Sequence, residues 1–249
     1  MSLLDVQGVS IRFGGLQAVA AMDMQVERGE LVGLFGPNGA GKTTLFNLIA
    51  GALLPDQGRV NLDGHDMTRL APHRRAQLGL GRTFQVVQPL QELSVADNLL
   101  VPMAHRALER LLPLRRYRRG HRMQRVDDLL QQVGLTEHAD HPAGQLPLGI
   151  KKRLELARVL ALEPRVLLLD EPLAGLPQNE AQRLLDVVAG IRHEMAVVLV
   201  EHNVGLAMRA CDRAMVMEAG RTIANGPPGS VRRDPEVIKA YFGEDDDDA

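Results

Sequence analysis

A glycine-rich segment constrains the fold of this chain more than any other feature of its sequence. Gly36 to Thr43 fits the pattern G-x-x-x-x-G-K-[ST] at every position, and it follows the short apolar run Leu31–Phe35. Glycines in this pattern let the backbone curl so that successive N–H groups point at anionic oxygens. The N-terminus of the following helix adds favourable partial charge. The segment therefore predicts a phosphate-binding loop after a buried strand, and a chance glycine-rich turn is the weaker alternative.

The side chains of this loop indicate a nucleotide that is bound together with Mg²⁺. We expect Lys42 to reach the β- and γ-phosphates and Thr43 to offer its hydroxyl to the metal. ATP is thus the expected substrate and Mg²⁺ the expected metal. The residues expected to contact ATP in this loop are Gly36, Pro37, Asn38, Gly39, Ala40, Gly41, Lys42, Thr43 and Thr44.

Two further apolar runs end in polar residues that suit hydrolysis. Val166–Leu169 predicts a buried strand that delivers Asp170 to the carboxyl edge of the sheet. Asp170 would orient Mg²⁺, and Glu171 would polarise the attacking water. Alone, such acids would more often cap a helix, but next to a phosphate loop they favour catalysis. The third run, Ala196–Val200, leads to His202.

The order of strand and helix patterns predicts one domain with an α/β core and a parallel sheet. Alternating apolar residues over 1–30 favour two antiparallel strands joined at Gly14-Gly15. From residue 89 to 162 a helical pattern interrupts the alternation, which indicates an inserted helical subdomain. We expect residues 1–88 and 163–243 to form the core with its antiparallel β subdomain. The acidic end, 244–249, is expected to be a disordered tail.

Composition and charge exclude several classes of function. The net charge is −2, from 29 basic and 31 acidic residues, and aromatic residues are 3%, so no nucleic-acid partner is expected. The single cysteine, Cys211, excludes a disulfide within the chain and suits a reducing compartment. No secretory signal and no apolar run of about 20 residues is visible. Any work at a membrane is therefore expected from a peripheral subunit.

Taken together, these motifs resemble the ATPase subunits of ABC transporters, and the likeness covers nearly the whole chain. The resemblance implies an α/β fold, a P-loop NTPase core with a parallel sheet, an N-terminal antiparallel β subdomain and an inserted helical subdomain. It matches Gln85, in Arg82-Thr83-Phe84-Gln85, to a loop that contacts Mg²⁺ and senses the membrane subunit. It also places His202 at the γ-phosphate and Phe13 under the adenine ring. The implied catalytic residues are Glu171, His202 and Gln85, and the implied Mg²⁺ ligands are Thr43, Gln85 and Asp170.

Two segments depart from the pattern of this family. The family signature is Leu-Ser-Gly-Gly-Gln, whereas this chain has Leu146-Pro147-Leu148-Gly149-Ile150. Pro147 offers neither the hydroxyl nor the N–H that would meet a γ-phosphate, and Pro177 stands where the family usually has Asp. Two ATPase domains of this family pair head to tail, so the altered signature would serve the partner's ATP. We therefore expect a second, different ATPase subunit as partner, with two sites of unequal activity.

Three further segments resemble the branched-chain (hydrophobic) amino-acid uptake group, and they are Arg12–Val19, Glu171–Leu176 and Asp234–Glu244. Chain length and Gly81–Gln85 favour the longer of the two ATPases in that group. The resemblance implies two membrane permeases, an indirect periplasmic solute-binding protein, and a cytoplasmic location on the inner face of the cell membrane.

Several alternatives stay open on the sequence. One alternative is a transporter of the same family that imports urea or amides instead of branched-chain amino acids. Another is a soluble ABC ATPase that acts on DNA or ribosomes. Pro147 and Pro177 also suit a nucleotide-binding regulatory or scaffold protein with low turnover. The basic run Arg115–Arg122 predicts a solvated face, with a contact to anionic lipid or a permease loop as the alternative.

Overall fold

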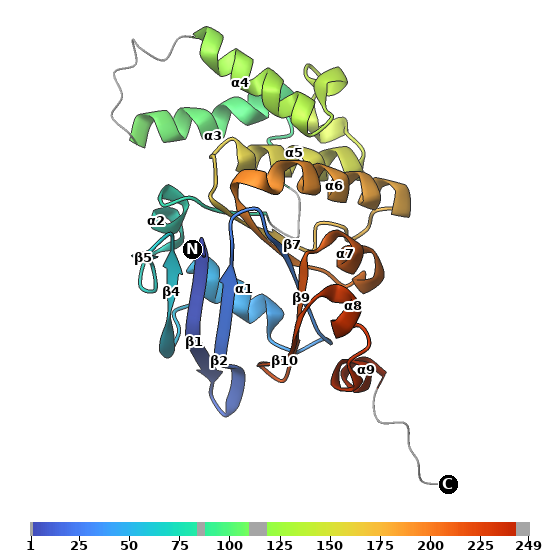
Figure 1. Cartoon of the computed structure of the whole chain (residues 1–249). Helices are drawn as coiled ribbons and strands as arrows, with labels where there is room; N and C mark the ends of the chain where they lie inside the picture. The colour runs from blue at the N-terminus through green and yellow to red at the C-terminus, as the bar shows by residue number, and fades with distance from the viewer. Residues whose placement is uncertain (1, 84–87, 110–118, 243–249) are drawn as a thin grey trace. The chain divides into compact units, whose positions relative to one another are not determined.

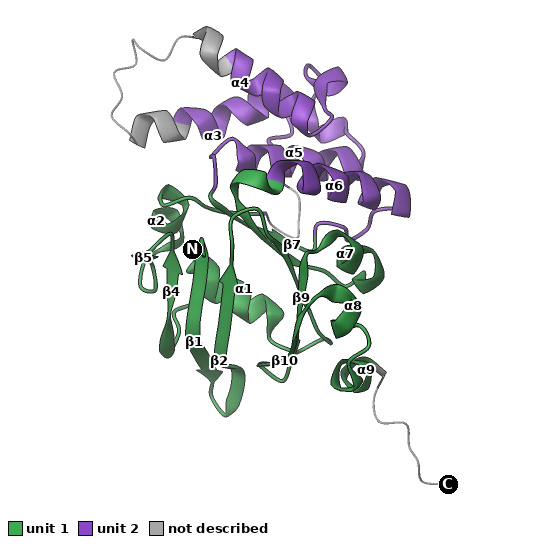
Figure 2. Ribbon diagram, in the orientation of Figure 1, with its two compact units in different colours: residues 1–82, 165–171, 192–249 green, residues 83–164, 172–191 purple. Residues whose placement is uncertain are grey.

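The computed structural model describes residues 2–83, 88–109 and 119–242. The chain divides into two compact units, which Figure 2 shows in separate colours. Unit 1 consists of residues 1–82, 165–171 and 192–249, and unit 2 of residues 83–164 and 172–191. The sequence pattern placed 172–191 with the core segment 163–243, whereas its packing assigns this stretch to unit 2.

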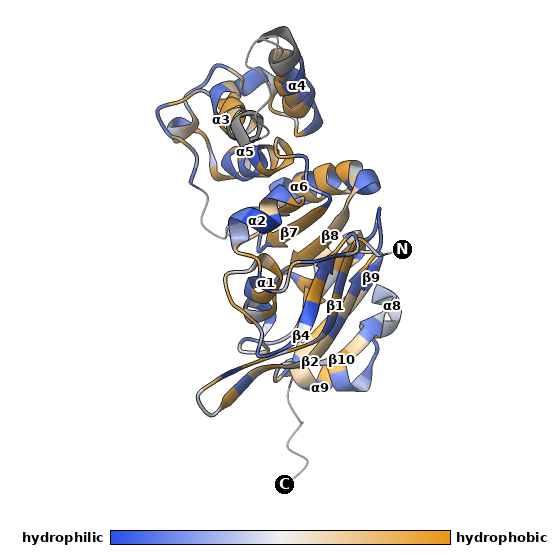
Figure 3. Cartoon of the chain, turned by 90° about the vertical axis from the view of Figure 1, so that its left-hand side faces the viewer, coloured by the Kyte–Doolittle hydropathy of each residue, from blue (hydrophilic) through white to orange (hydrophobic). Residues whose placement is uncertain are grey.

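A six-stranded sheet forms the centre of unit 1, in the order β10-β9-β3-β8-β7-β6. All neighbours are parallel except β9 and β10, which form an antiparallel hairpin around Gly220 as its sequence predicts. Apolar residues fill β3, β7 and β8, which are buried along their whole length, as expected of central parallel strands (Figure 3). The strands are β3 Leu31–Phe35, β6 Leu80–Arg82, β7 Val166–Asp170, β8 Ala196–Val200, β9 Arg213–Glu218 and β10 Arg221–Gly226.

A second, antiparallel sheet of unit 1 has the order β2-β1-β4-β5 (Figure 1). The expected two strands before residue 30 are β1 Leu4–Phe13 and β2 Leu16–Val26, joined at Gly14-Gly15. A two-residue turn at Asp63-Gly64, with both residues at positive φ, joins β4 Gln57–Leu62 to β5 His65–Asp66. Asp and Gly are the residues that such a turn requires.

Helix α1, Lys42–Ala50, links the two sheets of unit 1 through one hydrophobic core. Leu45, Phe46, Leu48 and Ile49 of α1 pack in the same cluster as the apolar faces of both sheets. Because this helix begins at Lys42, the core that buries α1 also fixes the position of the glycine-rich loop. The other helices of unit 1 are α2 Pro72–Gln77, α7 Val204–Ala210, α8 Pro228–Val231 and α9 Pro235–Phe242, with a 3₁₀ turn at Arg192–Glu194.

Unit 2 is helical. It contains α3 Val95–Glu109, α4 Arg119–Gln132, α5 Leu148–Leu160 and α6 Gln178–Ile191, with 3₁₀ turns at Thr136–His138 and Ala143–Gln145. Residue types that favour helix caps stand at two helix ends: the Ser94 hydroxyl accepts the Asp97 N–H at 3.0 Å before α3, and Gly134 adopts φ 67° after α4. One face of α6 is apolar and buried, with Ala181, Leu184, Leu185 and Val188 at 1–2% exposure. Of the basic run 115–122, residues 115–118 lie outside the described residues, and the side chains of residues 119–122 are not described.

Cys211 is expected to be unreactive in the folded chain. The thiol is buried at the end of α7, and desolvation raises its pKa to about 12. At pH 8 the nucleophilic thiolate is then a minor species. Labelling with Ellman's reagent should therefore be at least about 100-fold slower in the native chain than in urea. Equal rates in the two conditions would contradict the burial of this side chain.

Candidate nucleotide site

The glycine-rich loop connects β3 to α1 at the carboxyl edge of the large sheet. Gly36, Gly39 and Gly41 have φ of 144°, 81° and 100°, a region that side chains with a Cβ rarely adopt. Space is limiting as well, because a Cβ on Gly36 would lie 2.1 Å from the Met217 carbonyl oxygen. A Cβ on Gly41 would lie 2.4 Å from the carbonyl oxygen of Ala18 on β2. Two of the motif glycines are thus required by the packing of the loop against β9 and β2.

The side chain of Lys42 lies inside this loop. Its ammonium group donates to the carbonyl oxygens of Gly36 at 2.7 Å and Pro37 at 2.9 Å. Lys42 is 6% exposed, and this desolvation lowers its pKa, while the negative charge of Glu171 acts in the opposite direction. A buried cation beside a concave row of N–H groups is a suitable partner for phosphate oxygens.

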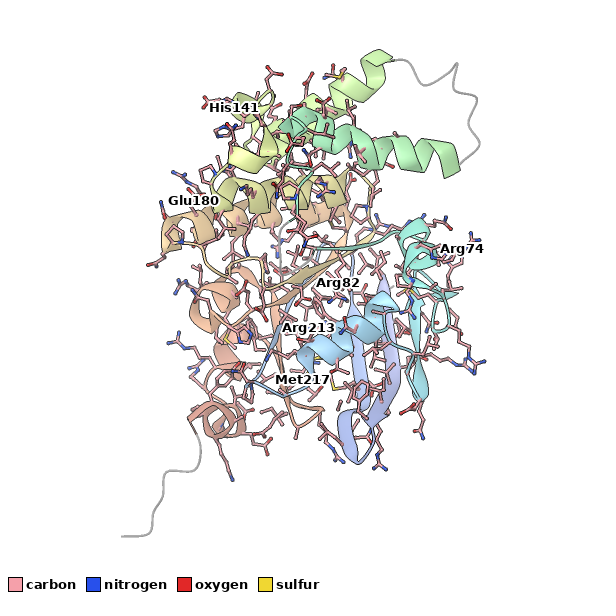
Figure 4. The ribbon with its side chains drawn as sticks, turned by 180° about the vertical axis from the view of Figure 1, so that it is seen from behind. Arg74, Arg82, His141, Glu180, Arg213 and Met217 are labelled. Carbon is pink, nitrogen blue, oxygen red and sulfur yellow. The ribbon has the colours of Figure 1, made fainter. Side chains whose placement is uncertain are left out.

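Asp170 ends β7 as the sequence predicts, and its carboxylate is already paired. The guanidinium of Arg82, at the end of the neighbouring strand β6, lies 2.7 Å from Asp170 Oδ2. The same guanidinium donates to Asn47 Oδ1 of α1 at 2.8 Å and lies over the ring of Phe46 (Figure 4). Arg82 therefore links the end of β7 to the helix that follows the phosphate loop.

Glu171 and His202 meet at the carboxyl ends of β7 and β8. Glu171 has the unusual φ of 48°, and its N–H donates to the Val200 carbonyl oxygen at 3.0 Å. This backbone turns the side chain toward β8, where Oε1 lies 2.9 Å from His202 Nε2. Strained backbone of this kind is frequent where a side chain must be held for function. The Glu171 side chain is 15% exposed and that of His202 is 50% exposed, so the pair can be reached by water.

The structure thus brings together, within unit 1, the loop and three of the residues expected around it: Asp170, Glu171 and His202. Thr43, in the first turn of α1, is exposed. A hydroxyl and a carboxylate are oxygen ligands of the type that Mg²⁺ uses beside phosphate oxygens, so the residues present fit this metal. Phe13 is 48% exposed at the end of β1, and Gln85 lies outside the described residues.

The signature segment begins α5 in unit 2. Pro147 occupies the N-cap position and makes no side-chain cap, but its carbonyl oxygen accepts the first helical hydrogen bond, from Lys151 N–H at 3.0 Å. Leu146 is buried and Leu148 is 44% exposed. A Cβ on Gly149 would lie 2.7 Å from Glu180 Oε2 of α6, so a larger residue here would require the Glu180 side chain to move. Pro177 directly precedes α6, and its carbonyl oxygen accepts the Ala181 N–H.

Two contacts of the site were not expected from the sequence. One is the ion pair between Arg82 and Asp170. The other is made by Tyr241 of α9, whose hydroxyl oxygen accepts the Gly36 N–H at 2.7 Å. Arg82 ends a strand, as Asp170 does, and this shared position could have indicated the pair. No local pattern indicates Tyr241, because 205 positions separate it from Gly36.

Replacing Arg82 by methionine is expected to raise the Mg²⁺ concentration at which nucleotide binding is half-maximal. The substitution keeps the length and apolar stem of the side chain but leaves Asp170 without the group that orients it. Loss of an outer partner of a metal ligand typically reduces metal affinity about 10- to 100-fold. Titration of MgCl₂ against a fixed concentration of fluorescent ATP analogue measures this affinity. An unchanged Mg²⁺ midpoint in the variant would show that Arg82 does not position Asp170.

Family profiles match most of the chain. A profile described as ABC transporter matches residues 19–174. A second, described as branched-chain amino acid ATP-binding cassette transporter, matches residues 221–247. Together they include the phosphate loop, β7 with Asp170, strand β10, and the C-terminal segment with Tyr241.

Individual relatives match over nearly their full length. The high-affinity branched-chain amino acid transport ATP-binding protein BraF of Pseudomonas aeruginosa is 41% identical, over 97% of this chain and 98% of its own. LivG of Escherichia coli, described in the same words, is 39% identical over the same shares. Among solved structures, the ADP conformation of MJ1267, an ATP-binding cassette of an ABC transporter, superposes with a TM-score of 0.86 and 29% identity. That match covers 98% of this chain and 100% of the other.

Proposed function

Because the chain belongs to the ABC transporter ATP-binding family and couples ATP hydrolysis to transport, we propose that it powers the uptake of branched-chain or closely related amino acids. The proposal that ATP is hydrolysed at this site rests on the 2.9 Å contact between Glu171 and His202, at the strand ends beside the phosphate loop. The amino-acid part is supported by the branched-chain profile over the C-terminal segment and by the full-length likeness to BraF and LivG.

The residues of the loop hold the nucleotide in this proposal. The N–H groups between Gly36 and Thr44 receive the phosphate oxygens, and Lys42 exchanges its two carbonyl partners for the β- and γ-phosphates. This exchange is favourable because phosphate oxygens are charged, whereas the carbonyl oxygens of Gly36 and Pro37 are neutral. Phe13, exposed at the end of β1, supports the adenine ring.

The acids and the histidine carry the reaction. Glu171 accepts a proton from the attacking water as the water oxygen bonds to the γ-phosphorus and the bond from that phosphorus to the bridging oxygen of the leaving ADP breaks. His202 holds Glu171 in place through Nε2 and contacts the γ-phosphate. Mg²⁺, which neutralises charge on the phosphates when bound, would be held by Thr43 and Asp170, with Gln85 as the third proposed ligand.

A different ATPase subunit is the proposed partner. In the head-to-tail pairing of this family, α5 of each chain faces the nucleotide of the other. The N-terminus of α5 here carries Pro147 in place of a hydroxyl donor, and Glu180 of α6 lies against Gly149. The carboxylate of Glu180 is paired with Arg183 at 2.8 Å and with Arg153 at 4.0 Å, yet as an acid beside Gly149 it would oppose an approaching γ-phosphate. The site completed by this signature should therefore be the weaker one.

Reconstitution with and without the partner tests this asymmetry. We expect each ATPase alone to be slow and the mixture to be about 10-fold faster or more, because each provides what the other site lacks. Phosphate release should be measured for each subunit and for the equimolar mixture. Full activity from this chain alone, with both sites equivalent, would refute the heterodimer.

The remaining partners in this proposal belong to the membrane. Two permease subunits would receive the conformational change, and a periplasmic binding protein would deliver the solute to them. No helix among the described residues is both long and apolar enough to cross a bilayer. We propose that the chain sits on the cytoplasmic face of the membrane, held by the permeases. Co-purification of the chain with membranes only when the permeases are present would support this location, whereas equal recovery without them would refute it.

A further inference from the structure

A cavity of about 510 Å³ opens between the three C-terminal helices of unit 1. Its wall is mainly apolar and includes Val204, Met208, Pro228, Val237, Ile238 and Tyr241. Val237 and Met208 are buried, while Ile238 is 47% exposed at the mouth. Small-molecule sites commonly have volumes of about 300–1,000 Å³ with mostly apolar walls and a few polar groups. The cavity is therefore of suitable size and lining for a small ligand.

Two arginines, Arg209 of α7 and Arg232 after α8, are the charged residues of this wall. Among the described residues, which end at Phe242, none that lines the cavity is acidic. Within the described part of the chain, neither guanidinium forms a hydrogen bond or an ion pair, and both side chains are exposed. A guanidinium binds carboxylate, sulfonate or phosphate through two parallel N–H groups. Apolar walls with two free cations are complementary to a molecule that has an apolar body and an anionic head.

One wall of the cavity is connected to the phosphate loop. The Tyr241 ring lines the cavity, and its hydroxyl oxygen accepts the N–H of Gly36 at 2.7 Å. The carbonyl group of the same residue, Gly36, accepts from Lys42. Tyr241 therefore binds the N–H of Gly36 and Lys42 binds its carbonyl oxygen. Lys42 must leave this carbonyl oxygen to bind phosphate. A ligand that fixes α9 in this position also favours the arrangement in which Lys42 is bound to the loop.

We propose that the cavity between α7, α8 and α9 is an effector site for a small amphipathic anion, and that its occupancy weakens nucleotide binding through Tyr241 and Gly36. The effect is reciprocal, since two ligands that prefer different arrangements of one residue lower each other's affinity by the same factor. The coupling rests on the nucleotide site proposed above, whereas the effector site itself does not.

Binding of 8-anilinonaphthalene-1-sulfonate to the full chain tests the site directly. We expect saturable fluorescence with about one probe per chain, displaced by octanoate and not by the uncharged 1-octanol. The double variant Arg209→Gln/Arg232→Gln should lose about 10-fold or more in affinity. Its matched control, Arg59→Gln/Arg221→Gln, removes two exposed arginines of the same unit and should bind like the wild type.

A second variant blocks the cavity without removing charge. Gly205 of α7 lines the cavity, and a Cβ there would meet no atom within 4 Å, so the backbone can carry a larger side chain and Gly205→Leu is chosen to occupy the cavity. Gly190→Leu of α6 is the matched control, because a Cβ there also meets no atom within 4 Å. Loss of probe binding in Gly205→Leu alone supports the site. Unchanged binding in both Gly205→Leu and the double arginine variant would overturn it.

The coupling is measured as the affinity for ADP with and without saturating octanoate. We expect octanoate to weaken ADP binding about fivefold or more in the wild-type chain. Tyr241→Phe keeps the ring in the cavity wall but removes the hydroxyl, so the probe should still bind while the effect on ADP disappears. An equal effect in Tyr241→Phe would overturn the coupling. A chain that binds the probe as expected but does not bind ADP would refute the nucleotide site and leave the effector site standing.

Discussion

Replacing Glu171 by glutamine is expected to slow ATP hydrolysis about 10²- to 10⁴-fold and to leave ATP binding intact, as removal of a general base commonly does. Glutamine has nearly the same shape as glutamate and can still contact His202, but its amide cannot accept a proton from water. The residues that we propose to hold phosphate, Lys42 and the loop, are unchanged. The variant should therefore retain ATP and accumulate in the ATP-bound state.

Phosphate release and the affinity for ATP are measured on the same preparation to separate chemistry from binding. Glu218→Gln is a suitable control, because Glu218 is an exposed acid at the end of β9 and should behave like the wild type. Hydrolysis by Glu171→Gln at more than a tenth of the wild-type rate would exclude Glu171 as the general base. Loss of ATP binding in the variant would show instead that the carboxylate holds the site together.

Replacing Arg75 by methionine is expected to lower the free energy of unfolding substantially, although Arg75 lies outside the nucleotide site. Arg75 is fully buried, and its guanidinium donates to the carbonyl oxygens of Leu48, Ile49, Thr68 and Leu70 at 2.6–2.9 Å. Two of these carbonyls, those of Leu48 and Ile49, end α1. Desolvation lowers the pKa of Arg75 to about 10, so the side chain stays charged at neutral pH.

The expected loss is roughly 3–5 kcal/mol, because each buried carbonyl oxygen left without a donor costs about 1–3 kcal/mol. Urea unfolding of the isolated chain measures it. Arg74→Met, on the same helix, is the matched control, since Arg74 is exposed and bonded only to Gln77 among the described residues. A loss below about 1 kcal/mol in Arg75→Met, similar to that of Arg74→Met, would mean that water replaces the guanidinium at little cost.

Local rules predicted the parts of the fold that depend on neighbouring residues. The strand before the loop, the turn at Asp63-Gly64, the cap at Ser94 and the positive φ of Gly134 follow from residue type and short-range spacing. The carboxyl ends of β7 and β8 were also predictable, because an apolar run that ends in a polar residue indicates a buried parallel strand that ends at the edge of the sheet. The sequence thus indicated that Asp170, Glu171 and His202 lie at the ends of these strands.

Long-range pairs were not predictable in the same way. Arg75 belongs to a polar, basic stretch of a kind that is mostly exposed in proteins. It is nevertheless buried, because its guanidinium donates to carbonyl groups that only the folded α1 presents. The contact of Tyr241 with Gly36 likewise depends on where α9 packs, and no spacing specifies it. The assignment of α6 to unit 2 follows from its packing with α4 and α5, which a linear pattern of strands and helices does not contain.

If hydrolysis at this site drives amino-acid uptake, a transport measurement in cells shows it most directly. The chromosomal copy is replaced by Glu171→Gln, with Glu218→Gln as control, and uptake of radiolabelled leucine and of urea is followed at equal protein levels. We predict that leucine uptake falls to background in Glu171→Gln, that it is unchanged in the control, and that urea uptake does not depend on the variant. Leucine uptake at the wild-type rate in Glu171→Gln would contradict the account.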